Sequence, residues 1–223
     1  MIHLYGLVQG LDDLPDLRGV DGAALERRRI AGLDVVVSRS TRELGEVTHD
    51  AILVHANVVE ELMSRSRAVL PAQFGRAFTS EEQLTEAVQT KATALERGLT
   101  RVRGCVELGL RVLERGSRTD ESTGLSGSDY MRTRLAEATE RDRFSQELHG
   151  PLAALSRTST RFGGASGDLL QAVYLVPEEQ IEAFRDYMNR IEGAHPELTM
   201  VCTGPWPPYT FADDREESHE RSP

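Results

Sequence analysis

The sequence predicts an α+β fold, with a small N-terminal α+β domain followed by a modified ferredoxin-like domain of βαββαβ order. Short apolar runs with strand character alternate along the chain with longer segments of helical periodicity. Stretches rich in Gly, Pro and Ser, which are typical of turns, separate these runs. We place the domains at residues 1–66 and 67–211, with a disordered acidic tail at 212–223.

The composition is that of a soluble globular protein, with 39% hydrophobic and 28% charged residues in a chain of 223. A net charge of −10 argues against nucleic acid or an anionic membrane as a partner, since both require a basic face. We expect a cytoplasmic location, because the N-terminus lacks a basic leader and no apolar run reaches membrane-spanning length. Cys105 and Cys202 lie in apolar, strand-like runs, which predicts buried, reduced thiols.

The N-terminal domain has the pattern of two strands and one helix. Residues 2–8, closed by Gln9-Gly10, and residues 33–37, with three consecutive β-branched side chains, are predicted strands. We expect a loop between them, with at most one helical turn at 23–29. From Thr48 to Met63 the apolar residues recur with a period near 3.6, which predicts an amphipathic helix.

The second domain is predicted to begin with a strand at 68–75 and a helix that starts at Ser80. Ser80 and Gln83 have the spacing of a capping box, in which the two side chains satisfy free backbone N–H groups reciprocally. The other expected elements are the rest of that helix to residue 102, strands at 105–113, 169–176 and 198–203, and a helix at 177–191.

A highly charged stretch is predicted to insert a helical hairpin into this domain, at about 127–157. Its first arm runs from 128 to 148 and its second from 151 to 156. Pro151 is expected to break the helix between them, because proline has no backbone N–H to donate. Polar, Gly/Ser-rich or acidic segments are expected to be mobile, at 116–127, 158–168 and 212–223.

The segment Gly204-Pro-Trp-Pro-Pro-Tyr-Thr-Phe211 is expected to form an extended strap on the surface. Three prolines lack the donors that a central strand needs. We expect Trp206 to pack against the C-terminal sheet or the N-terminal domain. Full burial would make Trp206→Ala cost about 3–5 kcal/mol.

No residue pattern predicts catalysis or metal binding. The six histidines are scattered, and the two nearest, His49 and His55, do not share a helix face. The Gly-rich stretch 161–168 follows a predicted helix and precedes a strand, the reverse of a phosphate-binding loop. Neither cysteine has a histidine nearby in the sequence. We therefore expect no enzyme activity, no cofactor and no metal.

Five stretches, in order along the chain, carry a resemblance to a known family. Two of them are specific, namely the Leu-Pro-x-x-Phe-Gly element within Val69–Gly75 and the Gly-Pro-Trp-Pro-Pro-Tyr element of the strap. The other three are Leu4–Val8, the helix from His55 to Leu62, and Ser128–Met131. In these stretches the chain resembles the gas vesicle protein F/L family (GvpF/GvpL).

This resemblance implies a non-enzymatic accessory or minor structural protein of gas vesicle formation. It implies binding to the small hydrophobic shell protein, a location at the gas vesicle, and other gas vesicle accessory proteins as further partners. The fold it implies agrees with the α+β and ferredoxin-like pattern derived above. An alternative remains from fold class alone, because ferredoxin-like domains often serve as small-ligand-binding or regulatory modules.

The residues proposed for partner contact are apolar, aromatic or part of the two specific motifs. Some of them must fill the core, and aromatic side chains are also favoured at interfaces, so only a minority is expected to touch the partner. The proposed residues are Val58, Val59, Leu62, Leu70, Pro71, Phe74, Gly75, Phe78, Trp206, Pro207, Pro208 and Tyr209.

Overall fold

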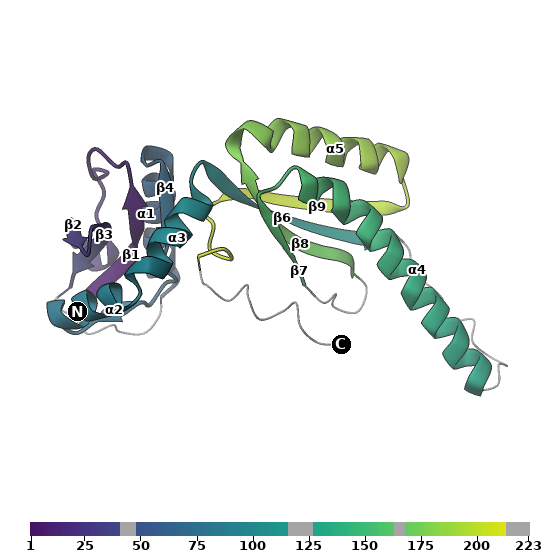
Figure 1. Ribbon diagram of the computed structural model, residues 1–223, viewed down its shortest axis with the longest axis horizontal. Coiled ribbons are helices and arrows are strands. Elements are labelled where there is room, and N and C mark those ends of the chain that lie inside the picture. The colour runs from purple at the N-terminus through teal and green to yellow at the C-terminus, as the bar shows by residue number, and fades with distance from the viewer. Residues whose placement is uncertain (41–47, 116–126, 163–167, 213–223) are drawn as a thin grey trace. The chain divides into compact units, whose positions relative to one another are not determined.

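The chain forms two separate β-sheets with helices packed on them, one sheet in each of two units (Figure 1). The computed structural model describes residues 1–40, 48–115, 127–162 and 168–212. The first unit consists of residues 1–107 together with the chain from Pro205 onward, and the second of residues 108–204. The predicted α+β class is therefore confirmed.

The sheet of the first unit is organised around β1 (Ile2–Gln9). Strand β3 (Leu33–Arg39) pairs antiparallel with one edge of β1, and β2 (Leu25–Ile30) extends the sheet beyond β3. Strands β4 (Ala68–Pro71) and β5 (Ala77–Phe78) pair with the other edge of β1. Every residue of β1 except the last is buried, as expected of a strand that is covered on both faces.

Helices cover the two faces of this sheet. Helix α1 (His49–Arg65) packs on one face, where its buried valines and Leu62 join the core cluster that includes Tyr5 and Val69. Helices α2 (Glu81–Thr90) and α3 (Ala92–Val102) follow β5. The side chain of Leu70, the strand neighbour of Val69, meets Gly98 of α3. Adjacent strand residues point to opposite faces, so α3 covers the face opposite α1.

Two predicted details of the first unit are wrong. The expected loop around 23–29 is strand β2, joined to β3 by a two-residue hairpin in which Ala31 and Gly32 have φ of 49° and 83°. As an edge strand, β2 can carry three arginines and so lacks the apolar run that predicts a strand. The expected helix 80–102 is two helices, because the backbone at Lys91 leaves helical geometry with φ −108° and ψ 10°.

The helix start at Ser80 is confirmed, with a different partner for Gln83. The Ser80 hydroxyl accepts a hydrogen bond from the Gln83 N–H at 3.3 Å. The Gln83 side chain accepts from the backbone N–H of Thr79 at 3.1 Å, one residue earlier than a capping box requires.

The boundary between the units also differs from the one predicted at residues 66 and 67. Strand β4 pairs with β1, so it belongs to the N-terminal sheet together with the helices that follow it. The chain passes into the second unit within β6 (Cys105–Glu114). The local pattern of β4 and α2 identified a strand and a helix, but it carried no information about which sheet the strand joins.

The second unit has the expected order βαββαβ, built from different elements. Its strands lie in the order β7-β8-β6-β9, which places β6 and β8 in the centre. The predicted strand 68–75 and helix 80–102 take no part in it, and the predicted insertion supplies its first helix. In chain order after β6 the elements are α4 (Gly127–Ala154), β7 (Thr158–Arg161), β8 (Asp168–Pro177), the short 3₁₀ helix Glu178–Gln180, α5 (Ile181–Ala194) and β9 (Leu198–Trp206).

The predicted helical hairpin is a single helix, α4, which continues through Pro151. Near the end of a long helix, a proline removes one backbone hydrogen bond without ending the helix. The C-terminal part of α4 packs on the sheet, and its N-terminal part extends beyond the sheet of its unit (Figure 1). Tyr174 of β8 contacts His149 of α4 and Phe184 of α5, so both helices lie on one face of the sheet.

The structure tests only part of the predicted mobile segments. Residues 158–161 form β7, which pairs antiparallel with β8, so the prediction of a loop there is wrong. The remaining predicted segments lie almost wholly in 116–126, 163–167 and 213–223, outside the described residues. Cys105 is buried as expected, whereas Cys202 is exposed on β9. Within the described residues, no helix combines the length and the apolar character needed to cross a membrane.

Replacement of Gly6 by alanine tests the close pairing of β1 with β4. A Cβ atom at Gly6 would lie 2.7 Å from the backbone oxygen of Leu70 and 3.2 Å from the Cα of Pro71. Backbone atoms cannot rotate away, so we expect Gly6→Ala to destabilise the protein by about 1–3 kcal/mol. Thermal unfolding measures the effect. In the control Gly193→Ala, the new Cβ on α5 meets no atom within 4 Å and should be neutral or stabilising by up to about 1 kcal/mol. Equal midpoints for wild type and Gly6→Ala would contradict the tight pairing.

Candidate partner-binding surface

The Leu-Pro-x-x-Phe-Gly motif is held against β1 by backbone hydrogen bonds. Leu70 and Pro71 are the last residues of β4, where Pro71 stands opposite Gly6. The following turn is fixed by the Ala72 N–H, which donates to the Tyr5 carbonyl at 2.8 Å, and by the Arg76 carbonyl, which accepts from the Leu4 N–H at 2.9 Å. These two bonds hold both ends of the turn against β1.

Within this turn, Gly75 has a φ of +86°. This left-handed conformation is strained for any residue with a Cβ atom, which gives a physical reason for glycine at this position of the motif.

The C-terminal motif is clamped onto the same unit by a buried carboxylate. Glu107 of β6 accepts two hydrogen bonds from Thr210, at 2.8 Å from its N–H and at 2.9 Å from its hydroxyl. Arg101 of α3 donates to the Phe211 carbonyl at 2.8 Å, and the Phe211 side chain is completely buried. The segment predicted as a strap is therefore anchored by specific bonds as well as by apolar packing.

The two specific motifs meet at a small hollow in the first unit. Its volume is about 110 Å³. Apolar side chains dominate its lining, together with Gln73 and Arg76 at the turn. Leu70, Pro71 and Ala72 come from the first motif, Tyr209 from the second, and Leu4, Leu7, Leu95 and Ala212 complete the lining. Segments more than a hundred residues apart in sequence thus form one surface feature.

Burial separates the predicted contact residues into two groups. Val58, Val59, Leu62 and Leu70 are 0–3% exposed and fill the core, and the predicted contact prolines Pro71, Pro207 and Pro208 are also buried. These residues pack beneath the proposed contact surface and are not accessible to a partner. Phe74, Phe78 and Tyr209 are half-buried, and Gly75 and Trp206 are exposed.

Trp206 is 46% exposed, so the condition of full burial, on which the predicted cost of its truncation depended, is not met. It stands at the end of β9, where the chain returns to the first unit. The expected loss of about 3–5 kcal/mol on truncation applies to a fully buried ring and therefore does not hold here. An exposed tryptophan is better suited to contact with a partner than to anchoring the C-terminal segment by apolar packing.

Sequence reasoning missed the exposed apolar side chains of Ile52 and Leu53 in the first turns of α1. Ile52 is 39% exposed and Leu53 is 53% exposed, while Val58, Val59 and Leu62 on the same helix face the core. The signal was present in the sequence, because Leu53 lies off the core-facing period of this helix. On α4 of the second unit, Met131 and Leu135 are 67% and 70% exposed.

Burial controls the titration of the groups around the hollow. Burial raises the pKa of Tyr209 to about 12, and the negative charge of Glu60 adds to this effect. Tyr209 is therefore a neutral phenol at neutral pH. Burial also raises the pKa of Glu107, and the hydrogen bonds from Thr210 oppose that shift. The hollow thus presents a largely apolar lining with a neutral Tyr209, and Arg76 is the one charged side chain among the described residues that line it.

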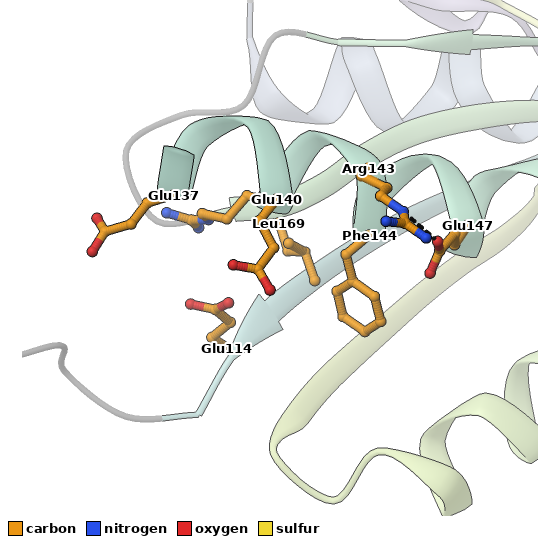
Figure 2. A pocket seen from close by; sticks show the side chains of 8 residues that line it. Glu114, Glu137, Glu140, Arg143, Phe144, Glu147 and Leu169 are labelled. Carbon is orange, nitrogen blue, oxygen red and sulfur yellow. Dashed lines mark hydrogen bonds and ion pairs between the residues drawn. The ribbon is translucent and has the colours of Figure 1, made fainter. Parts of the chain in front are cut away.

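A second hollow, in the second unit, has the opposite chemistry. It has a volume of about 460 Å³ and lies between α4 and the ends of β6 and β8. Figure 2 shows the carboxylates of Glu114 and Glu140 at one end and the ion pair of Arg143 with Glu147 at the other. Only Phe144 and Leu169 provide apolar lining. Small-molecule pockets are mainly apolar with few polar groups, so this lining is a poor match to one.

No group of three or more potential metal ligands occurs among the described residues. His49 and His55, the nearest pair in sequence, differ in environment, since His49 is exposed and His55 is buried. His55 is instead hydrogen-bonded to His3 of β1.

Comparison with known proteins identifies similar chains along the full length. A family described as gas vesicle synthesis protein GvpL/GvpF matches residues 1–213. Gas vesicle proteins F1 and F2 of Halobacterium salinarum are 30% and 31% identical to the chain, over 95% of the chain and 92% of each relative. The crystal structure of GvpF from Anabaena sp. PCC7120 covers 95% of both chains with a TM-score of 0.79 at 20% identity, which shows a shared fold.

Replacement of Glu107 tests the anchoring of the C-terminal motif. Glu107→Val removes both acceptors and leaves the partly buried Thr210 N–H unpaired, which should cost about 1–3 kcal/mol. Chymotrypsin, which cuts after aromatic residues, should then cleave at Tyr209 and Phe211 faster than in wild type.

The matched control is Glu107→Gln. Its amide oxygen can accept from the Thr210 N–H, while its amide NH₂ donates to the Thr210 hydroxyl, so cleavage should stay close to the wild-type rate. If Glu107→Val and wild type were cleaved equally fast, the clamp would have no role in holding the motif.

Proposed function

Because this chain belongs to the gas vesicle synthesis protein GvpL/GvpF family, we propose that it is a non-enzymatic accessory or minor structural protein that binds the hydrophobic shell protein and aids its assembly. The family establishes a role in gas vesicle formation. The partner and the mode of binding are our proposal.

The observation that carries this proposal is the meeting of the two specific motifs at the apolar hollow of the first unit. Leu70 and Pro71 come from one motif and Tyr209 from the other, and Glu107 fixes the second motif in place. A core alone would not require a glycine turn and a proline-rich segment to be presented at the surface. A common binding surface accounts for both.

The physical role follows from the chemistry of a gas-facing shell. A shell subunit must present apolar surface to gas, so before assembly it exposes surface that promotes aggregation. An acidic protein of net charge −10 that covers this surface would keep the complex dispersed in water. The apolar side chains of the first unit would provide the contact.

The exposed members of the first unit are the proposed contact residues. Leu53 and Trp206 are about half-exposed, and Phe74, Phe78 and Tyr209 are partly accessible. The buried valines of α1 and Leu70 would support this surface without touching the partner. The contact would be dominated by a few aromatic and aliphatic side chains, as is usual for interfaces.

No described feature favours the alternative of a small-ligand-binding module. The larger hollow is lined mainly by charged side chains, and its apolar lining is limited to Phe144 and Leu169. A metabolite screen by thermal stabilisation separates the two functions, because a ligand that binds the folded state raises its melting temperature.

Co-purification with the shell protein tests the proposal. A tagged chain co-expressed with the shell protein should retain it on capture. Leu53→Lys places a charge in the proposed contact and should weaken retention by about tenfold or more, equivalent to a loss of about 1.4 kcal/mol. Quantification of the shell protein in the captured fraction measures the effect.

The matched control is Leu135→Lys on α4, where a side chain of comparable exposure lies in the second unit. It should leave retention unchanged. Retention should also persist or increase when salt is raised, because salt screens charge interactions and leaves apolar contacts intact. Loss of the complex at moderate salt, or equal effects of the two substitutions, would contradict an apolar contact through the first unit.

A further inference from the structure

Two histidines on different elements form a buried hydrogen-bonded pair in the first unit. His3 of β1 is 4% exposed and His55 of α1 is 2% exposed. The Nε2 atom of His3 lies 2.9 Å from Nδ1 of His55, and Nε2 of His55 lies 2.9 Å from the Ala72 carbonyl oxygen. The pair therefore links strand, helix and the turn of the Leu-Pro-x-x-Phe-Gly motif in one chain of bonds.

The Ala72 carbonyl determines where the protons lie in this chain. A carbonyl oxygen only accepts, so Nε2 of His55 carries a proton and Nδ1 of the neutral ring is an acceptor. The Nε2–H of His3 must then donate to it. This leaves Nδ1 of His3 as an unprotonated, buried nitrogen, and it has no hydrogen-bond partner in the described structure.

The surroundings of the pair are mainly aromatic and carry little compensating charge. The rings of Tyr5 and Phe74 lie 4.9–5.7 Å from the two imidazoles, centroid to centroid. The ionisable groups that act on His3 are His55 of α1, which lowers its pKa, and Asp21, which raises it. By element, the neighbours are Tyr5 of β1, Asp21 before β2, Ser38 of β3 through the Tyr5 hydroxyl, and Ala72 and Phe74 of the turn.

A proton added to this pair has one free site, Nδ1 of His3. The resulting charge would lie in an aromatic enclosure without an acceptor for the new N–H, which disfavours it strongly. A second proton, on His55, would direct two N–H groups at each other and break the chain of bonds. In agreement, burial lowers the pKa of His3 to about 4, with the neighbouring His55 as a further cause, and burial also lowers the pKa of His55.

We propose that the His3–His55 pair is a proton-sensitive latch, which holds the turn from Ala72 to Gly75 in its binding form when neutral and releases it when protonated. The consequence for partner binding rests on the proposed function, because Ala72 lines the hollow where the two motifs meet. His3 and His55 are positioning residues in this scheme and do not touch the partner. Mild acid would thus weaken binding without unfolding the chain.

The direction of the pH effect follows from linkage. Folding lowers the pKa of His3, so the state in which the turn is released binds a proton more readily than the state in which the pair holds the turn. The stabilisation is complete above the ordinary histidine pKa of about 6.5 and is lost as pH falls toward the folded value of about 4. For His3 alone, the opening equilibrium should rise about tenfold between pH 7.5 and 5.5.

Hydrogen exchange of the Ala72 amide in the intact protein measures this opening directly. Its N–H is bonded to the Tyr5 carbonyl beside the pair. After correction for intrinsic exchange, protection should fall about tenfold from pH 7.5 to 5.5 in wild type. In His3→Gln, whose amide can still donate to His55 but does not titrate, only His55 still takes up a proton, so protection should fall less than in wild type. The control His149→Gln alters a partly buried histidine of the second unit and should keep the wild-type response.

Histidine nitrogen NMR of the wild type provides a reading that needs no variant. At pH 7.5 it should show Nε2–H tautomers for both rings and no proton on Nδ1 of His3. Protonated Nδ1, titration of both rings near pH 6.5, or pH-independent exchange at Ala72 would overturn the latch.

Capture of the shell protein at the two pH values separates the latch from the function. Retention should be weaker at pH 5.5 than at pH 7.5 in wild type, and this loss should be smaller in His3→Gln, where only His55 still titrates. Absence of capture at pH 7.5 together with pH-dependent exchange would contradict the proposed function and support the latch. Unchanged capture between the two pH values, with exchange responding as predicted, would overturn the regulatory part of the proposal.

Discussion

The pairing of β4 with β1 is the constraint on which the rest of the first unit depends. It requires glycine at position 6, because the Leu70 backbone oxygen occupies the space of a Cβ atom. The pairing delivers the turn after Pro71 to the Tyr5 carbonyl and to His55. It also directs the Leu70 side chain toward α3. The C-terminal motif is bonded to α3 through Arg101 and is held by Glu107 of β6. One strand register thus brings together two motifs that are remote in sequence.

The chemistry of the two hollows supports the proposed binding to an apolar partner. The hollow of the first unit is small and mainly apolar, with Gln73 and Arg76 at its turn, and its tyrosine stays neutral at ordinary pH. The hollow of the second unit is larger, and charged side chains that water solvates well dominate its lining.

Local sequence pattern predicted elements well and their pairing poorly. The strands at 2–8 and 169–176 and the helix from Thr48 were identified because burial imposes a period on apolar residues. Strand β2 was missed because an edge strand with three arginines has no such period. The assignment of β4 to the wrong sheet arose because pairing is a tertiary choice that a single strand does not encode. Helix α4 was divided at Pro151, although packing of its C-terminal part outweighs the loss of one hydrogen bond.

Photo-crosslinking from position 209 tests the central claim most directly. Tyr209 lines the hollow where the two motifs meet, whereas Tyr187 of α5 is a partly exposed tyrosine of the second unit. A photoreactive aromatic residue at each position, in the full chain co-expressed with the shell protein, should give a crosslink from 209 and none from 187. Crosslinks from 187 alone, or from neither position while the complex is still captured, would contradict binding through the surface of the first unit.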